Sequence, residues 1–280
     1  MSGYRSWAVA VQLRPGRLTF AGQLGSAHTH AHAAVQLLLV TSGEVLLADD
    51  GGSELPVQAA VIPAGAAHAV RADQARGVMV YLDAAGRQAR GLTARLAQVT
   101  EHATGVGNSH ACVAAWQAAA RPALAVLTTL TVDITTDLTA GLEASGGVVA
   151  ALTGQGDPVA PPQGGGLHTA LAMLPELVAT GEPIRLEAVA AQVGLSASRL
   201  RHLFTEQLGL PFTACVRWAR LQAAMHTVRD GGTLTAAAHA AGFADSAHLT
   251  RVFHAMFGLA PSTAIRHLTW HMPESAEPTT

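Results

Sequence analysis

Histidine recurs at every second position in one short stretch of the chain, where His28, His30 and His32 are followed by Gln36. If this stretch is a continuous strand, its residues of equal parity share one face, and the four side chains point the same way. A further imidazole, that of His68, follows a proline-glycine turn that can deliver it from a neighbouring strand. Imidazole nitrogens bind Zn²⁺, Fe²⁺ or Ni²⁺, and they also hydrogen-bond polar molecules. The pattern therefore predicts a binding site in the N-terminal part of the chain.

A second set of candidate residues lies on two predicted helices near the C-terminal end. A helical wheel places short polar or basic residues on one arc of each helix and large apolar residues on the opposite arc. The first polar arc contains Ser198, Arg201, His202 and Thr205. The second contains Ala247, Thr250, Arg251 and His254. Hydroxyl and guanidinium groups are side chains that reach phosphates and base edges of DNA.

These two helices belong to an internal repeat. Four residues of the first copy return 49 positions later, as Leu200 and Leu249, Phe204 and Phe253, Gly209 and Gly258, Leu210 and Leu259. Each copy begins with a short apolar helix, over residues 186–193 or 234–241, and continues through a glycine turn. A polar N-cap then opens the longer helix, Ser196 in the first copy and Asp245 or Ser246 in the second. The repeat predicts two helix-turn-helix units joined by a long helix over about residues 211–230.

The elements before the repeat are of two kinds. Short apolar runs broken by Gly, Asp and Pro predict strands between Leu18 and Leu82. Residues 108–121 are Ala-rich, and apolar residues then recur at helical spacing, at Leu127, Leu130, Ile134, Leu138 and Leu142. We expect helices there that pack on the strands and pair two subunits. The predicted organisation is a β domain over residues 1–100, a helical region over 101–153, a Gly- and Pro-rich linker over 154–166 and a helical domain over 167–271.

Composition limits the class of protein further. A chain of 280 residues is long enough for two domains with separate cores. It has no apolar run near the ~20 residues that span a bilayer and no signal-peptide pattern, so we expect a cytoplasmic protein without a membrane partner. The two cysteines, Cys112 and Cys215, lie far apart and read as reduced thiols. Residues 181–271 contain eight Arg and five acidic residues, a balance of +3 that is compatible with binding nucleic acid.

The repeat resembles the DNA-binding domain of AraC/XylS-type transcription regulators over about residues 167–270. The first half carries GLSASRLRHLF at residues 194–204, and the second carries AAHAAGFADSAHLTRVF at residues 237–253. In that family the two longer helices enter successive major-groove segments of a double-stranded operator. The resemblance implies that Ser198, Arg201, His202 and Thr205 read DNA in the first unit, and that Ala247, Thr250 and Arg251 do so in the second. Ala247 offers at most a contact with a thymine methyl group.

The histidine stretch resembles the two sequence motifs of cupin domains. His30, His32 and Gln36 fall in the first motif, and His68 closes the second. This resemblance implies an N-terminal β-barrel whose interior holds a divalent transition metal or a metal-free effector. Metal cupins have Glu where this chain has Gln36, and losing that charged ligand weakens a metal site. Three interpretations stay open: a metal site made of these four residues, an effector site made of the same residues, and a purely structural cluster.

Together the resemblances imply an α+β two-domain fold, with a cupin-like β-barrel and following helices joined to an all-α domain with two helix-turn-helix units. We expect a transcription regulator without catalytic residues, controlled by a small-molecule effector and active as a homodimer. RNA polymerase is a further expected partner if the protein activates transcription. The alternative is a cupin oxygenase or isomerase that carries a DNA-binding tail. Turnover of a small molecule by residues 1–156 would favour that alternative.

Overall fold

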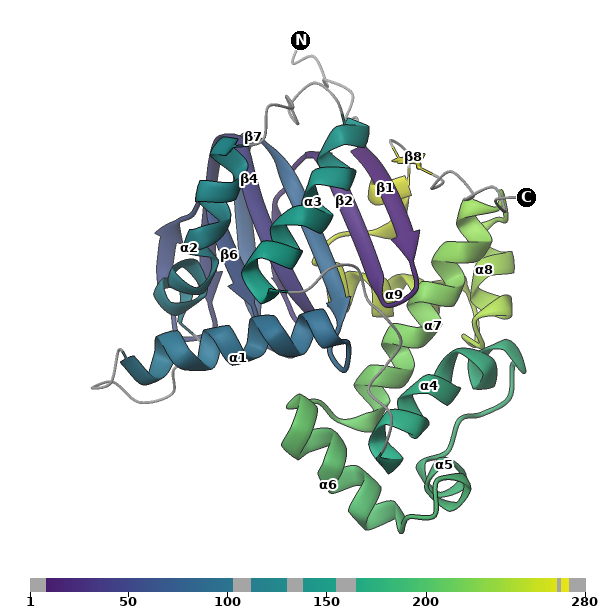
Figure 1. Cartoon of the computed structure of the whole chain (residues 1–280). Helices are drawn as coiled ribbons and strands as arrows, with labels where there is room; N and C mark the ends of the chain where they lie inside the picture. The colour runs from purple at the N-terminus through teal and green to yellow at the C-terminus, as the bar shows by residue number, and fades with distance from the viewer. Residues whose placement is uncertain (1–8, 103–111, 130–137, 155–164, 266–267, 272–280) are drawn as a thin grey trace, which may run out of the picture.

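The structure, a computed structural model, describes residues 9–102, 112–129, 138–154, 165–265 and 268–271 (Figure 1). The strands of the N-terminal domain are β1 (Val9–Arg14), β2 (Arg17–Gln23), β3 (Ala27–His30), β4 (Ala34–Asp49), β5 (Glu54–Pro56), β6 (Ala59–Ile62) and β7 (His68–Asp83). Its helices are α1 (Arg87–His102), α2 (Val113–Thr129) and α3 (Leu138–Thr153). The strands therefore start earlier than predicted and end before α1, which lies inside the predicted β domain.

The strands form one mixed sheet in the order β5-β4-β7-β2-β1-β8, in which β8 (Leu268–Trp270) comes from the far end of the chain. In addition, β6 pairs with β4, and β3 pairs with β7. The β1 and β8 pair is parallel and the other pairs are antiparallel. Residues Leu268–Trp270 were predicted to be helical, and that prediction is wrong because their backbone groups pair with β1.

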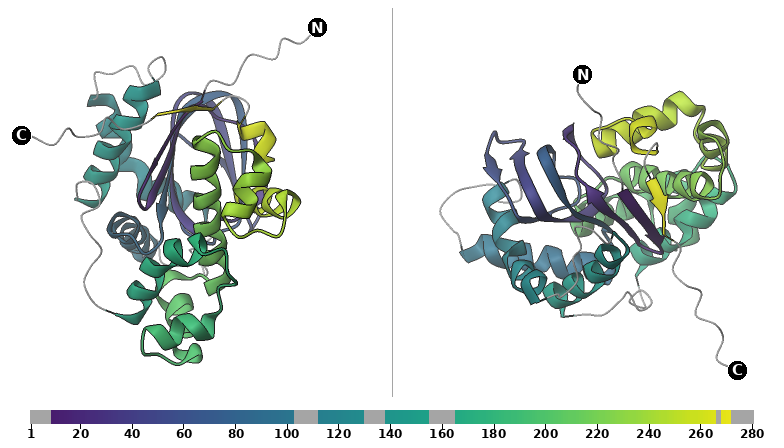
Figure 2. Two further views of the ribbon diagram at one scale, coloured as in Figure 1. Left: turned by 90° about the vertical axis from the view of Figure 1, so that its right-hand side faces the viewer. Right: turned by 90° about the horizontal axis from the view of Figure 1, so that it is seen from above.

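The predicted closed barrel is also wrong, because the sheet is open. Its strand order ends at β5 on one side and at β8 on the other, and no strand pair among the described residues joins these two ends. The long strands β4 and β7 bend where their register shifts between Val40 and Glu44, so the sheet is curved. Helices of the C-terminal domain, rather than further strands, lie against the face opposite α1, α2 and α3 (Figures 1 and 2).

Both faces of the sheet are covered (Figures 1 and 2). Helices α1, α2 and α3 lie on one face, and they bury an apolar cluster that includes Leu37, Val80 and Trp116. Helices α7 and α9 contribute to a second cluster, which also contains Phe20 and Tyr81 of the sheet. Burial on both faces explains why the strands read as apolar runs instead of alternating apolar and polar residues.

The C-terminal domain consists of α4 (Gly166–Ala179), α5 (Leu186–Gln192), α6 (Ala197–Leu208), α7 (Phe212–Arg229), α8 (Leu234–Ala240), α9 (Ser246–Phe257) and α10 (Pro261–Ile265). Helix pairs α5 with α6 and α8 with α9 are the two predicted units, and α7 is the predicted long helix between them. The bounds predicted for α5, α7 and α8 agree with the structure to within one residue at each end. Burial raises the pKa of the Cys215 thiol on α7 to about 12, so this cysteine stays protonated.

The helical region between the domains is described only in part. Helices α2 and α3 pack on the sheet as expected. Of the apolar residues that were predicted to pair two subunits, Leu142 is buried within its own chain, and Leu130 and Ile134 lie outside the described residues. Pairing of two subunits through these residues therefore stays a prediction. Most of the predicted linker, residues 155–164, also lies outside the described part of the chain. In the described residues, no helix is long and apolar enough to cross a membrane.

A carboxylate connects the two domains. The Trp218 Nε1–H group of α7 donates a hydrogen bond of 2.6 Å to Asp83 Oδ1, and the Gln222 side-chain amide donates another of 2.9 Å to the same oxygen. The loss of contact with water raises the pKa of Asp83, and the two donors oppose this shift. Docking of α7 on the end of β7 therefore encloses a carboxylate that accepts two hydrogen bonds from α7.

The Asp83→Asn variant should be at least as stable as the wild type at neutral pH, because an amide oxygen still accepts both bonds without a buried charge. A raised folded-state pKa means that the wild type loses stability as pH rises from about 4, so the advantage of Asn should grow over that range. Asp83→Leu should instead cost about 1–3 kcal/mol, because it leaves two donors unpaired. Thermal unfolding of both variants tests this, and equal destabilisation by Asn and Leu at neutral pH contradicts it.

Candidate functional site

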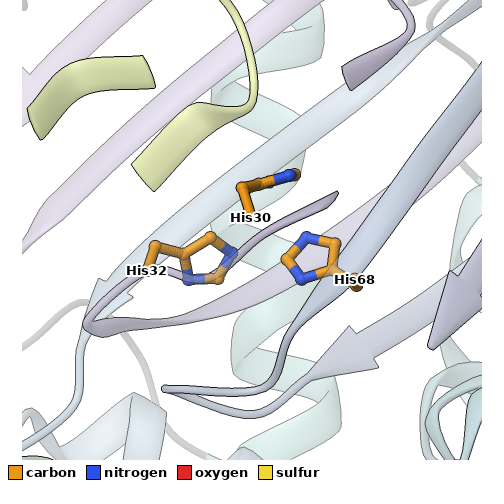
Figure 3. A group of neighbouring side chains, drawn as sticks. All are labelled: His30, His32 and His68. Atoms are coloured by element: carbon orange, nitrogen blue, oxygen red, sulfur yellow. The ribbon is translucent and has the colours of Figure 1, made fainter. Parts of the chain in front are cut away.

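Three buried histidines converge at one end of the sheet (Figure 3). His30 is the last residue of β3 and pairs in register with His68, the first residue of β7. His32 lies in the connection between β3 and β4. One ring nitrogen from each lies within 4.8 Å of the other two, a spacing at which one metal ion can be shared. The centres of the His30 and His68 rings are 4.2 Å apart.

The strand that was predicted to carry these residues is not continuous. It breaks after His30, and β4 starts at Ala34. Gln36 of β4 nevertheless reaches the cluster, with its Oε1 atom 2.9 Å from His32 Nε2. His28 does not, because it is exposed and its ring stacks on that of His254 in α9, with centroids 6.4 Å apart. The structure thus brings together the four residues of the predicted effector and metal site.

All three rings of the cluster are held by backbone carbonyls. The Nδ1 atoms of His30, His32 and His68 lie 2.7, 2.8 and 3.0 Å from the oxygens of His28, Ala34 and Ala66. Because a carbonyl oxygen only accepts, each Nδ1 carries the hydrogen. In the neutral ring each Nε2 atom therefore carries a lone pair, which can accept a hydrogen bond or bind a metal. Metal-binding histidines have the same arrangement, in which the second ring nitrogen donates to a fixed acceptor.

Burial keeps these rings neutral. It lowers the pKa of His32 to about 4, and the pKa values of His30 and His68 also fall below the usual 6.5. A neutral His32 with its hydrogen on Nδ1 requires the Gln36 amide to rotate so that its NH₂ group donates to Nε2. The Nε2 atom of His68 is buried without a hydrogen-bond partner, which is costly. The donor set of three neutral imidazoles fits Zn²⁺, Fe²⁺ or Ni²⁺.

A pocket adjoins the cluster, and both domains form its walls. His30, Gln36 and Tyr81 line it from the sheet, while α9 contributes Phe253 and Phe257. Its lining is mainly apolar, and burial raises the pKa of Tyr81, so this phenol is neutral. Sequence reasoning placed the effector site inside the N-terminal domain alone. No local pattern indicated that the second helix-turn-helix unit would complete the pocket.

The two predicted reading helices have matching ends. Ser196 Oγ accepts from the Arg199 amide at the start of α6, and Asp245 Oδ1 accepts from the His248 amide at the start of α9. Both helices end at a glycine in the left-handed conformation, with φ of 67° at Gly209 and 68° at Gly258. The second N-cap is therefore Asp245, which decides between the two residues that the sequence left open.

The predicted DNA-reading arcs point away from the core. Thr250 is half-buried, and the other predicted DNA-reading residues are exposed. The exposed residues are Ser198, Arg201, His202, Thr205, Ala247 and Arg251. The two threonine hydroxyls donate to helix carbonyls, Thr205 to His202 at 3.0 Å and Thr250 to Ser246 at 2.8 Å. These hydroxyls therefore offer DNA a lone pair rather than a hydrogen. Among the described residues neither Arg201 nor Arg251 forms an ion pair, so both guanidinium groups are available for phosphate or guanine.

Acid should destabilise the ligand-free protein. The unfolded chain protonates His32 near pH 6.5, whereas the folded chain does so only near pH 4. The unfolded state thus binds more protons between these values, and the free energy of unfolding falls with pH by on the order of 3 kcal/mol. His32→Gln should lose less stability than the wild type between about pH 7 and about pH 5, whereas His239→Gln, at an exposed position, should behave as the wild type. Identical losses in all three proteins contradict this prediction.

Comparison with known proteins agrees with this geometry. Residues 189–267 match a family described as a helix-turn-helix domain. The crystal structure of ToxT from Vibrio cholerae O395 is similar over 91% of this chain and 99% of that chain, with a TM-score of 0.53 and 12% sequence identity. Wild-type ToxT from Vibrio cholerae strain SCE256 with a bound unsaturated fatty acid is similar over 96% and 98%, with a TM-score of 0.50 and 13% identity. No curated protein sequence matches this chain.

The solved structures share the two-domain fold with this chain. The family match falls on the part of the chain that contains α6, α7 and α9, where the repeat and the exposed arcs lie. The motifs, the helix pairs and the family match therefore agree that the C-terminal part of this protein contains a helix-turn-helix domain.

Proposed function

We propose that this protein is a transcription regulator that binds an operator through α6 and α9 and is controlled by a small molecule. The observation that carries the proposal is the pocket between the domains. One of its walls contains His30 and Gln36, and the opposite wall is α9, the second reading helix. A molecule that enters the pocket therefore touches an element that reads DNA, and differential contacts of this kind can shift a conformational equilibrium.

The two helix-turn-helix units present different side chains to DNA. The first presents Ser198, Arg201 and His202, and a guanidinium group can bind a guanine through two hydrogen bonds. The second relies on Thr250 and Arg251, because Ala247 supplies only a methyl group. The matched lengths and caps of α6 and α9 support their use as a pair in successive major-groove segments.

The histidine cluster and the adjoining pocket would form two parts of one effector site. His30, His32 and His68, with Gln36 beside them, would hold a divalent transition metal. Such an ion supplies a positive charge and binding positions for an anionic or polar group. The apolar walls suit an apolar molecular body. The fatty acid bound to the structurally similar ToxT has such a body, which supports a ligand of this shape for the present chain.

An enzymatic function is the second candidate, and the convergence of three neutral imidazoles is what favours it. The group of possible metal ligands found in the described residues contains only histidines, without the carboxylate of metal cupins. Purified full-length protein loaded with Fe²⁺ and screened for oxygen uptake against a small-molecule panel tests this function. Sustained turnover would replace the regulator proposal with that of an enzyme bearing a DNA-binding domain.

Replacing Arg201 or Arg251 with Ala should weaken binding to an operator by about 1–3 kcal/mol, which is roughly five- to 160-fold, if each arginine reads a guanine. The operator is first selected from random duplexes with the wild-type chain. Arg121→Ala removes the same charge from an exposed site on α2 and serves as the control. If all three variants lose the same factor on selected and random duplexes, the arginines do not read sequence.

The full-length protein, purified without a histidine tag and incubated with Zn²⁺, should retain about one metal ion per chain after dialysis. His68→Ala should lose most of this metal, because it removes the ring whose Nε2 atom has no partner. His239→Ala, on exposed α8, should retain it. Elemental analysis measures the content. Equal metal content in the two variants would show that the cluster does not hold the ion.

A further inference from the structure

The described wall of the pocket beside the histidine cluster carries no formal charge. None of the described residues that line it is Asp, Glu, Lys or Arg. Its polar side chains are those of Gln23, His30, Gln36, Tyr81 and Thr263. Two of these can ionise, but burial lowers the pKa of His30 and raises the pKa of Tyr81, so both are neutral at pH 7. The described wall therefore offers hydrogen bonds to a ligand but no opposite charge to an anion.

This neutrality favours a ligand whose polar head group is uncharged. A carboxylate that leaves water for an apolar site without a cation loses far more hydration free energy than a hydroxyl group does. His30 adds to this preference, because its Nδ1–H group donates to the carbonyl oxygen of His28 and its Nε2 atom can therefore only accept. A hydroxyl group can donate to such an atom, whereas a carboxylate only accepts. The empty cluster thus suits an alcohol-like head group.

A divalent ion in the cluster would reverse this preference. His30 belongs both to the cluster and to the pocket wall, so an ion shared by the three rings places its charge beside the pocket. The histidines are neutral ligands, and in the described part of the chain no acidic residue belongs to this group of possible metal ligands. The Gln36 amide next to His32 is neutral as well. The charge of the ion would stay uncompensated by these residues, and it would attract a carboxylate of the ligand.

The rest of the pocket wall accepts the apolar body that either head group would carry. The sheet contributes Phe20, Leu38 and Met79, and α9 contributes Phe253 and Phe257. Burial of an aliphatic chain against such side chains is favourable in proportion to the apolar area removed from water, and it does not depend on the head group. Two ligands with the same chain therefore differ in affinity mainly through the charge of the head group.

We propose that the histidine cluster selects the head group of the ligand. The empty cluster takes an amphiphile with an uncharged head group, and the cluster that holds a divalent transition metal takes an amphiphilic carboxylate. The ion and the carboxylate then bind cooperatively, and each raises the affinity for the other by the same factor. The inference deepens the proposed function, because it rests on the proposed metal and effector site, but it does not depend on DNA binding.

The first experiment compares 1-octanol with octanoate, which have chains of the same length. Full-length protein is stripped of metal with a chelator, and each ligand is titrated calorimetrically at neutral pH. 1-Octanol should bind at least about tenfold more tightly, because only octanoate loses the hydration of a charge. If octanoate binds to the stripped chain as tightly as 1-octanol does, the empty cluster does not select against charge and the proposal is overturned.

The second experiment repeats both titrations with the Zn²⁺-loaded chain. Octanoate should bind at least about tenfold more tightly than without Zn²⁺, and the affinity for 1-octanol should change by less than about threefold. Octanoate should also raise the affinity for Zn²⁺ by the factor by which Zn²⁺ raises the affinity for octanoate. Elemental analysis of the same samples separates two kinds of failure. A loaded chain without this coupling overturns the selection alone, whereas a chain that retains no Zn²⁺ overturns the proposed metal site together with the coupling.

Two variants locate the coupling in the cluster. His68→Ala removes a ring of the cluster that does not line the pocket, and it should lose the gain for octanoate because it loses the ion. Gln36→Glu places a carboxylate next to His32, so it should hold Zn²⁺ more tightly and reduce the gain for octanoate to less than about threefold. His239→Ala, at an exposed position on α8, should keep the full gain. Circular dichroism confirms that each variant is folded, and if His68→Ala is not, Gln36→Glu decides. A full gain in a folded His68→Ala or in Gln36→Glu overturns the proposal.

Discussion

Among the described residues, it is the C-terminal domain that keeps the second face of the sheet from water. Phe20 and Tyr81 point into the same apolar cluster as Trp218 and Phe257, so the two domains share a core. Separating them would expose this surface at about 25 cal/mol for each Å² of apolar area. The open sheet, the pocket and the position of α9 all follow from this shared burial. The shared core also explains why an enclosed carboxylate, Asp83, is tolerated at the interface, where two donors of α7 compensate for lost water.

The chemistry of the histidine cluster follows from the same enclosure. Imidazoles in water would protonate near neutral pH and repel a cation, whereas burial lowers the pKa of His32 to about 4 and keeps its ring neutral. The backbone carbonyls then fix which nitrogen is free. The site is thus organised before any ligand arrives, and the unpartnered Nε2 atom of His68 is the cost of that organisation.

The sequence predicted the elements whose signals are local and repeated. Ser196, Gly209 and the apolar arc of α6 belong to one helix of 12 residues and its two caps, and the second copy repeats each of them, so the helix pairs of the C-terminal domain could be predicted closely. The His30–His68 pairing was foreseen in part, because parity and the turn before His68 indicated convergence although the strand breaks. The open sheet was missed, because closure depends on which distant segments meet its edges. The contribution of Phe253 and Phe257 to the pocket was missed for the same reason, since domain docking leaves no periodic signal.

The parallel pairing of β8 with β1 has a consequence for how the protein is made. The two strands are separated by almost the whole described chain, and His271 donates its amide to Val11 at 2.8 Å. During synthesis the N-terminal strands emerge first and can pair with one another, but β1 stays an unprotected edge until β8 has left the ribosome. The nascent N-terminal domain therefore spends most of translation with one strand edge and one apolar face uncovered. Its exposure to chaperones and to pairing with other nascent chains ends only when the DNA-binding domain has been completed.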